Sequence, residues 1–430
     1  MTRDHSRRHD MRVRRLPLLL LQAAIALASP ASFAAVLCDA YATGDGPALS
    51  LPGQHPPGRR SLSLEATPTG TGDSRHASPR SLALLVWYPA ALDGCGPASP
   101  YRQVLERHAW RPLPAAQIDI DVPSAATEGA PVSQGQRYPV VVLSHGLLGW
   151  GSAFTYLGDH LASRGYVVVA IDHRDDLPGP LDPLKSALAF RSADQLATIA
   201  ALRRWSSDPQ HFLHGRIDTD RIALVGYSMG GFGALQTAGQ QDPGLKGVVA
   251  IAPWGGQSHV GAIDRSALRT LTVPVLFVAG DHDDVSGFQD GIRSLFQGAA
   301  GSDRWLLAYQ NARHNVGGYP LPAIANQVLE LQPFFVDPVW RIGRIQAVNR
   351  HFVTAFLDLT LKADTTRRAY LEPPTARSND GRWPVENPFD LTDPMADSSA
   401  APGFWPGFRR RSALGLELMH LAPGQSQTPQ

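Results

Sequence analysis

The sequence predicts an α/β protein with a mostly parallel central sheet and helices on both faces of that sheet. From Tyr138 onwards, short and continuously apolar runs alternate with segments whose apolar residues recur at helical spacing. Strands that are apolar throughout are buried on both faces, which is typical of parallel sheets covered by helices. With 430 residues, of which 43% are hydrophobic, the chain is long enough to bury a sizeable core.

The expected elements follow one another with short connections. Strands are predicted over 81–90, 138–146, 166–172, 221–226, 245–254, 273–280 and 304–310. Helices are predicted over 152–165, 192–205, 230–238, 287–298 and 344–361. Residues 43–80, rich in Gly, Pro and Ser, are expected to form a loop with strand pieces at most, and residues 91–137 an excursion over the surface. A late strand or packing segment is expected over 413–421.

The N-terminus has the layout of an export signal. Arg12, Arg14 and Arg15 precede an apolar stretch over 16–28, and the small residues that follow favour cleavage after Ala34. A buried first helix is the alternative, but a basic flank and a small-residue exit are typical of signals. The apolar stretch is also short for a membrane span.

We therefore divide the chain into a signal peptide over 1–34, an α/β domain over 35–362 and a Pro-rich C-terminal extension over 363–430. The extension is expected to pack on the domain or to be partly disordered. Export predicts a periplasmic or secreted protein, with no transmembrane segment after signal removal. An oxidising compartment favours a disulfide between Cys38 and Cys95, and two buried thiols are the alternative.

The charge balance excludes one class of partner. The formal net charge is +1, so the sequence gives no electrostatic reason to expect nucleic acid or another polyanion. A small molecule or a lipid remains the expected partner, and the sequence leaves the oligomeric state open.

The segment Gly226-Tyr227-Ser228-Met229-Gly230 carries the clearest chemical signal. It joins a predicted strand to a predicted helix, as in a nucleophile elbow, where a serine sits on a strained turn that leaves no room for flanking side chains. The alternative is a tight turn that happens to contain a serine. The strand before the motif and the helix after it favour Ser228 as a nucleophile.

A serine nucleophile needs a base and an acid that orients the base. In an elbow of this kind the acid follows the serine in the chain and the histidine follows the acid. His314 comes after the strand predicted over 304–310, and Asp281, Asp283 and Asp284 come after the strand over 273–280. The order predicts His314 as the base, while the three aspartates compete for the role of the acid.

An oxyanion hole needs two backbone N–H groups. One is expected from Met229, the residue after the nucleophile. The second is expected from the loop over 144–151, which follows a strand and precedes a helix, with Leu147 as the candidate donor. His145 in the same loop is expected to orient the loop rather than act as a second base.

At this point a resemblance to a known family becomes specific. The stretch YPVVVLSHGLLGWGSAFTYLGDHLASRGYVVVAIDHRDD resembles the plasma-type platelet-activating factor acetylhydrolases and their bacterial relatives. Those enzymes resemble in turn the dienelactone hydrolases and polyester hydrolases of the α/β-hydrolase fold. The motifs LLVWYPA, DTDRIALVGYSMGG, VAGDHDD and ARHN follow in the expected order within residues 81–360.

The resemblance implies a serine esterase without a metal or another cofactor. It selects Asp283 as the acid, three positions after Gly280, and Leu147 as the donor that follows the His-Gly pair. Dienelactone hydrolases place cysteine at the elbow, so Ser228 argues against that activity. The motif IAPWGG resembles polyester hydrolases, in which Trp254 would form an aromatic wall for the substrate, although those enzymes do not usually carry the His-Gly loop. A core role is the alternative for Trp254.

The sequence thus predicts an exported serine esterase that hydrolyses short-acyl esters, with platelet-activating-factor-like phospholipids as one candidate substrate. A polyester hydrolase or another carboxylesterase or lipase is the alternative. Two further hypotheses are an inactive hydrolase fold used for binding and a metal-dependent enzyme built on His282, Asp283 and Asp284. Adjacent residues in one loop rarely converge on an ion unaided, which argues against the metal.

Overall fold

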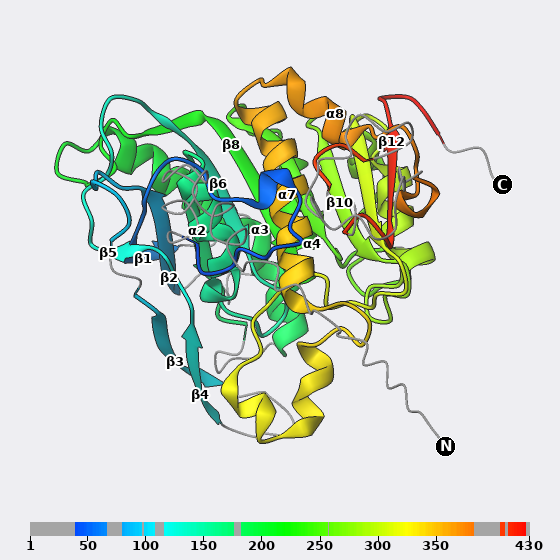
Figure 1. Cartoon of the computed structure of the whole chain (residues 1–430), viewed down its shortest axis with the longest axis horizontal. Helices are drawn as coiled ribbons and strands as arrows, with labels where there is room; N and C mark the ends of the chain where they lie inside the picture. The colour runs from blue at the N-terminus through cyan, green and yellow to red at the C-terminus, as the bar shows by residue number, and fades with distance from the viewer. Residues whose placement is uncertain are drawn as a thin grey trace, which may run out of the picture.

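The computed structural model describes residues 39–66, 80–96, 99–107, 116–175, 182–256, 258–381, 405–408 and 412–426. Its centre is a ten-stranded sheet, in the order β12-β11-β10-β9-β8-β6-β7-β2-β1-β5 (Figure 1). The six strands from β11 to β7 run parallel to one another. The flanking strands β12 and β2 pair with this block in antiparallel fashion, which agrees with the prediction of a mostly parallel sheet.

The strands of the parallel block are buried, except for residues 218–221 of β8 and Lys246 of β9. This burial explains their continuous apolar runs, because helices cover both faces. The bounds of the large sheet are β1 (Pro57–Ala66), β2 (Arg80–Pro89), β5 (Thr127–Glu128), β6 (Tyr138–Ser144), β7 (Val167–Asp172), β8 (Ile217–Tyr227), β9 (Leu245–Ile251), β10 (Val275–Gly280), β11 (Arg304–Tyr309) and β12 (Leu416–Leu421).

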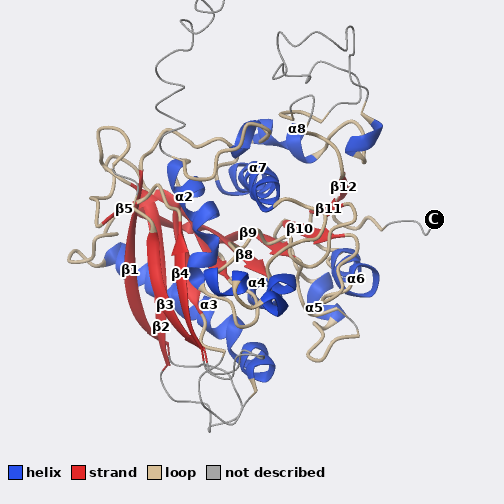
Figure 2. Ribbon diagram, turned by 60° about the horizontal axis from the view of Figure 1, so that its bottom comes forward, coloured by secondary structure: helices blue, strands red, loops and turns tan. Residues whose placement is uncertain are grey.

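Helices cover both faces of the sheet, as predicted. Figure 2 shows α2 and α7 on one face and α3, α4, α5 and α6 on the other. The α-helices are α2 (Thr155–Ser163), α3 (Pro183–Ser207), α4 (Met229–Ala238), α5 (Arg265–Arg269), α6 (Ser294–Gly298), α7 (Ile342–Leu361) and α8 (Arg368–Leu371). A wide helical turn, η4 (Phe288–Arg293), leads into α6, and short 3-10 turns are η1 (Ala48–Ser50), η3 (Gly151–Phe154), η5 (Ala323–Asn326), η6 (Leu329–Phe334), η7 (Thr365–Arg367) and η8 (Ser378–Asp380).

Helix α3 begins earlier than the predicted helix because of its cap. The side chain of Asp182 accepts a hydrogen bond from the Lys185 N–H, and Pro183 occupies the first turn, where its missing N–H costs nothing. The extra turns extend the helix along α4.

The prediction that residues 43–80 form a loop with strand pieces at most was wrong. The ten residues of β1 pair with β2 along their whole length, from Pro57 opposite Pro89 to Ala66 opposite Arg80. Polar residues alternate with apolar ones from Ser61 to Ala66, the pattern of a half-buried strand, within a stretch whose Gly, Pro and Ser content favoured a loop. The predicted excursion over 91–137 contains a separate antiparallel ribbon, β3 (Tyr101–Arg107) and β4 (Ala116–Val122).

The C-terminal extension adds β12 to the edge of the large sheet, antiparallel to β11. The predicted signal peptide lies outside the described residues. So does Cys38, and the Cys38–Cys95 disulfide therefore stays a prediction. Within the described ranges, none of the helices is both long and apolar enough to cross a membrane.

Candidate active site

Ser228 lies on a strained turn between β8 and α4. Its backbone has φ 54° and ψ −116°, in the left-handed half of conformational space that side-chain-bearing residues rarely occupy. Glycine is required at the neighbouring positions because other backbone groups come too close to leave room for a side chain. A Cβ on Gly226 would lie 2.1 Å from the Gly230 carbonyl oxygen, and one on Gly230 would lie 1.9 Å from that of Ser144. The local sequence therefore builds the elbow that was predicted.

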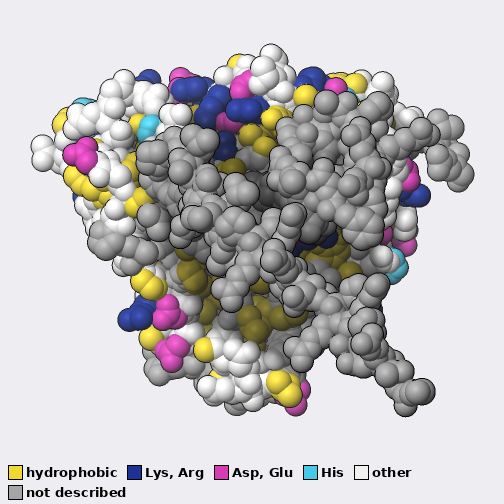
Figure 3. All heavy atoms as spheres, in the orientation of Figure 1, with side chains coloured by type: hydrophobic (Ala, Val, Ile, Leu, Met, Phe, Trp, Pro, Cys, Tyr) yellow, Lys and Arg dark blue, Asp and Glu magenta, His cyan; other side chains and the backbone are white. Residues whose placement is uncertain are grey.

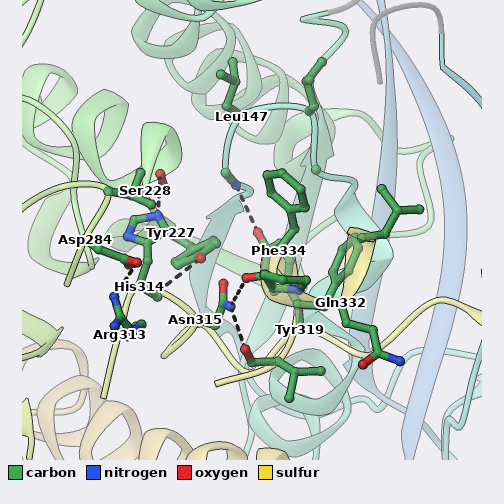
Figure 4. Close-up of a pocket in the computed structure, with 18 of the residues that line it drawn as sticks. Leu147, Tyr227, Ser228, Asp284, Arg313, His314, Asn315, Tyr319, Gln332 and Phe334 are labelled. Carbon is green, nitrogen blue, oxygen red and sulfur yellow. Dashed lines mark hydrogen bonds and ion pairs between the residues drawn. The ribbon is translucent and has the colours of Figure 1, made fainter. Parts of the chain in front are cut away.

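Three side chains form a continuous hydrogen-bonded series at the carboxyl ends of β8, β10 and β11. The Oγ of Ser228 lies 3.1 Å from Nε2 of His314, and Nδ1 of His314 lies 2.8 Å from Oδ2 of Asp283 (Figure 4 shows the first pair). All three residues are buried, with exposed fractions of 6–8%. This is the geometry in which a base accepts a proton from a serine while a carboxylate orients the base.

The side chains of the three competing aspartates point to different hydrogen-bond partners. Asp283 faces His314, and its other oxygen accepts hydrogen bonds from the N–H groups of Val285 and Ser286 at 2.9 and 2.7 Å. Asp281 instead accepts from the Asn311 N–H at 2.6 Å and contacts the ring of His282.

Asp284 pairs with Arg313 at 2.7 Å on the surface. His282, Asp283 and Asp284 therefore point to three different partners and do not converge on one point, unlike the ligands of a metal site.

The environment of Asp283 keeps its carboxylate ionised. Burial alone would raise the pKa of Asp283, but the hydrogen bond and charge of His314 and the two backbone N–H donors outweigh burial and leave the pKa below its usual value. The ring of Tyr227 packs against that of His314, with ring centres 5.2 Å apart. Burial raises the pKa of Tyr227, so its phenol stays neutral beside the histidine.

The two predicted oxyanion donors lie beside the serine. Met229 is the first residue of α4, where backbone N–H groups have no partner inside the helix. Leu147 lies in the loop after β6 and lines the same cavity as Ser228 and His314 (Figure 4). Within the part of the chain that the structure describes, neither the Leu147 N–H nor the Met229 N–H donates a hydrogen bond.

His145 is buried beneath this loop rather than exposed to the cavity. Its Nε2 accepts a hydrogen bond from the His173 N–H at 2.9 Å. Burial and the charge of Arg191 lower the pKa of His145, so the ring is neutral, and its Nδ1 donates to the Gly146 carbonyl oxygen at 2.6 Å. These contacts are those of a residue that orients the loop.

A large cavity opens beside Ser228. Its volume is about 1650 Å³, and most of its wall is apolar. In the space-filling view, hydrophobic side chains gather in the lower part of the face, where Figure 1 draws the chain between β11 and α7 in yellow (Figure 3). The aromatic residues of the wall are Trp150, Tyr227, Tyr319, Phe334 and Phe335.

Part of this wall was missed by the sequence analysis. The η5–η6 segment, residues 321–336, contributes Leu329 and Phe334, which are each 66% exposed. Asn315, next to His314, holds the segment by donating from Nδ2 to the carbonyl oxygens of Pro333 and Val336 at 2.8 and 3.1 Å. The only available signal was the apolar and Pro-rich composition between the last strand and the closing helix.

Trp254 is half-buried beside the nucleophile rather than part of this cavity wall. Its backbone N–H donates to the Ser228 carbonyl oxygen at 3.1 Å. Its ring stacks on His259, with ring centres 3.8 Å apart, and its Nε1–H donates to the Val260 carbonyl oxygen. A role of Trp254 in substrate binding therefore stays a prediction.

Comparison with known proteins places this site in a family. A family model described as PET hydrolase-like matches residues 125–355, which is more than half of the chain. The chain belongs to the PET hydrolase-like family. The match covers Ser228, Asp283, His314 and the loop that carries Leu147.

Curated relatives of this PET hydrolase-like protein include esterases. It is 31% identical over 182 residues to cutinase est1 of Thermobifida alba, covering 42% of this chain and 55% of the relative. It is 30% identical over 201 residues to the bis(hydroxyethyl) terephthalate hydrolase of Streptomyces coelicolor, covering 46% and 58%. The PET hydrolase-like chain thus spans somewhat more than half the length of these two relatives.

A solved structure of a ferulic acid esterase from Streptomyces cinnamoneus is similar to the PET hydrolase-like chain. The TM-score is 0.54 with 23% identity, over 74% of this chain and 94% of that one. At this identity the likeness concerns the fold alone. Together with the family match, it confirms the predicted α/β-hydrolase fold. The narrower resemblance to platelet-activating factor acetylhydrolases stays a prediction.

Proposed function

We propose that this protein is a serine carboxylic ester hydrolase that works through an acyl-enzyme. The observation that carries the proposal is the series from Ser228 through His314 to Asp283, with its two short contacts of 3.1 and 2.8 Å. A binding protein built on an inactive hydrolase fold would not need a serine on a strained turn within reach of a buried, carboxylate-oriented histidine.

The chemistry follows from these positions. Ser228 Oγ attacks the ester carbonyl carbon, while His314 Nε2 accepts the hydroxyl proton and Asp283 stabilises the imidazolium that forms. The negative charge that develops on the carbonyl oxygen is stabilised by the N–H groups of Leu147 and Met229. The imidazolium then protonates the leaving alcohol, and a water molecule hydrolyses the acyl-enzyme by the same steps in reverse.

For the substrate, we infer a bulky apolar or aromatic ester. The cavity of about 1650 Å³ exceeds the roughly 300–1,000 Å³ of common ligand sites, and five aromatic side chains line it. An acetyl or butyryl group would leave most of this apolar wall unfilled. The names of the relatives, cutinases and a bis(hydroxyethyl) terephthalate hydrolase, support the same class of ester. The short-acyl phospholipid remains the competing substrate.

A periplasmic or secreted location is part of the proposal, because the N-terminal 34 residues have the layout of an export signal. Sequencing of the mature N-terminus tests this part. Cleavage after Ala34 gives a mature protein that begins at Ala35. A start at Val36 would place the cleavage site one residue later, and an unprocessed chain would contradict the export signal.

The test of the activity uses labelling and turnover together. Wild-type protein is expected to react with a fluorophosphonate in one-to-one stoichiometry and to hydrolyse aryl esters, and Ser228→Ala is expected to lose both. Ser302→Ala is the matched control, since Ser302 is also buried but donates to the Leu271 carbonyl oxygen away from the cavity. A wild type that is neither labelled nor active would contradict the proposal and favour the inactive binding protein.

A panel of esters then separates the substrates. Terephthalate and ferulate esters are expected to give a higher kcat/KM than acetyl esters and than a phospholipid with a short sn-2 chain. The reverse order would restore the short-acyl assignment and leave the proposed catalytic residues unaffected.

A further inference from the structure

Arg191 lies buried beneath the loop that carries Leu147. It projects from α3, its side chain is fully buried, and it forms an ion pair with Asp175. Its Nη1 donates to the His145 carbonyl oxygen at 2.7 Å, and its Nη2 donates to the Gly146 carbonyl oxygen at 3.0 Å. One guanidinium thus holds two successive carbonyl groups of the oxyanion loop.

The three successive peptides of this loop differ in which of their N–H and carbonyl groups form hydrogen bonds. In the peptide between His145 and Gly146 both ends are held, because the carbonyl oxygen accepts from Arg191 and the Gly146 N–H donates to the hydroxyl of Tyr319 at 3.0 Å. In the peptide between Leu147 and Leu148 the N–H donates to the Asp175 carboxylate at 3.1 Å.

Among the residues that the structure describes, the peptide between Gly146 and Leu147 is held only through its oxygen. That oxygen accepts from Arg191, from His145 Nδ1 at 2.6 Å and from the Gly149 N–H at 3.0 Å. A trans peptide directs its N–H away from its carbonyl oxygen. A carbonyl held on the buried arginine therefore directs the Leu147 N–H away from α3 and toward the cavity that Leu147 lines.

The same helix also fixes the other oxyanion donor. A Cβ on Gly233 of α4 would lie 2.7 Å from the Arg191 Cβ, so α3 and α4 are in close contact at this point. Thr237 of α4 donates to the Gln195 side chain of α3 at 2.8 Å. Met229 begins α4, so Arg191 touches both elements that carry the two N–H donors.

We propose that Arg191 is a positioning residue for the oxyanion hole, which it holds by fixing the Gly146–Leu147 peptide. This inference rests on the proposed ester hydrolysis. Hydrogen bonds to charged groups are stronger than neutral ones, and a donor on a carbonyl oxygen polarises the N–H of the same peptide. Arg191 therefore both directs the Leu147 N–H and strengthens it as a donor, while Asp175 balances the buried charge.

The test compares variants per titrated active site. Arg191→Lys keeps the charge but loses the two-pronged contact. The double variant Arg191→Met with Asp175→Asn removes both charges, so that no lone carboxylate remains buried. Fluorophosphonate titration counts the competent serines, which separates a loss of folded protein from a loss of turnover.

We expect the double variant to lose about 100-fold in kcat per titrated site, the magnitude associated with one oxyanion donor, with KM little changed. Arg191→Lys is expected to lie between the double variant and wild type. The affinity for phenylboronic acid, whose tetrahedral serine adduct places an oxygen in the hole, should fall with kcat. Arg304→Lys is the control, because Arg304 is also fully buried and also donates to backbone carbonyl oxygens, at the opposite end of β11.

One outcome would contradict the positioning role of Arg191, and a different outcome would contradict the proposed ester hydrolysis. If both Arg191 variants keep kcat per titrated site and boronate affinity within about threefold of wild type, Arg191 is structural only and the inference fails. A wild type that neither reacts with fluorophosphonate nor turns over esters refutes the proposed function itself, before any variant is compared.

Discussion

The hydroxyl oxygen of Tyr319 accepts a hydrogen bond from the Gly146 N–H at 3.0 Å. This contact joins the loop that follows His314 to the loop that follows β6, although the two residues are 173 positions apart in sequence. The ring of Tyr319 also packs against Tyr227 and Phe154, with ring centres 4.9 and 5.2 Å apart. The tyrosine therefore connects the loop of the base to the loop of the oxyanion donor.

We predict that Tyr319→Phe lowers kcat per titrated site about 5- to 30-fold. The change leaves the buried Gly146 N–H without its acceptor, which costs about 1–2 kcal/mol and loosens the Leu147 peptide. Steady-state kinetics with active-site titration measure the effect. Tyr88→Phe is the control, because the Tyr88 hydroxyl donates to the Ala130 carbonyl oxygen away from the site. Equal loss of kcat in both variants would show that Tyr319 acts through general stability.

For the acid, we predict that Asp283→Asn lowers kcat by about three to four orders of magnitude. An amide in this position favours the wrong tautomer of His314 and cannot stabilise an imidazolium. Asp281→Asn and Asp284→Asn should retain most of the activity, since neither carboxylate contacts His314. Parallel kinetics of the three variants decide the matter. If Asp284→Asn loses more activity than Asp283→Asn, then Asp283 is not the acid and our assignment is wrong.

The exposed edge of the cavity gives a prediction about selectivity. Phe334→Ser should lower kcat/KM for bulky aromatic esters several-fold more than for acetyl esters, with little change in thermal unfolding, because Phe334 lines the cavity but is 66% exposed. Leu414→Ser is the control, as Leu414 is 47% exposed and is not part of the cavity wall. If both classes of ester lose activity equally, Phe334 does not contribute to selectivity.

Asp159 gives a prediction about pH and stability. Burial in α2 raises the pKa of Asp159 to about 7, although its carboxyl accepts hydrogen bonds from Ser124 Oγ and the Ala125 N–H. A carboxyl with a raised folded pKa contributes most below its unfolded pKa, near 3.9, and its contribution is lost as the pH rises to about 7. Wild-type unfolding free energy should therefore decline over this range, by up to a few kcal/mol.

Asp159→Asn should remove this slope and stabilise the protein above pH 7, since an uncharged amide fits the same site. Denaturant unfolding at pH 4, 5.5 and 8 measures both effects. A variant that is less stable than wild type at pH 8 would mean that the ionised carboxylate is stabilising in the folded state.

The sequence by itself determined the features that are local or periodic. The elbow at Ser228 was predictable because strand, turn and helix follow one another without interruption. Gly226 is required by its close approach to Gly230 within the elbow, whereas Gly230 is required by the Ser144 carbonyl of β6. The parallel block was predictable because burial on both faces leaves a continuous apolar run. The position of His314 beside Ser228 was predictable from the chain order that this kind of elbow imposes.

Only the tertiary structure decided the features that depend on where a side chain points or on which distant segments pack together. The residue pattern alone left Asp281, Asp283 and Asp284 open and the family resemblance favoured Asp283, while the turn after β10 is what presents Asp283 to His314. The alternation in β1 is compatible with a strand, but which strand it pairs with, β2, is set by the tertiary structure. Arg191 precedes the helix predicted over 192–205 and lies 45 positions from Gly146 in the sequence. Its contact with the oxyanion loop exists because α3 packs against α4 and beneath that loop, an arrangement that no local pattern encodes.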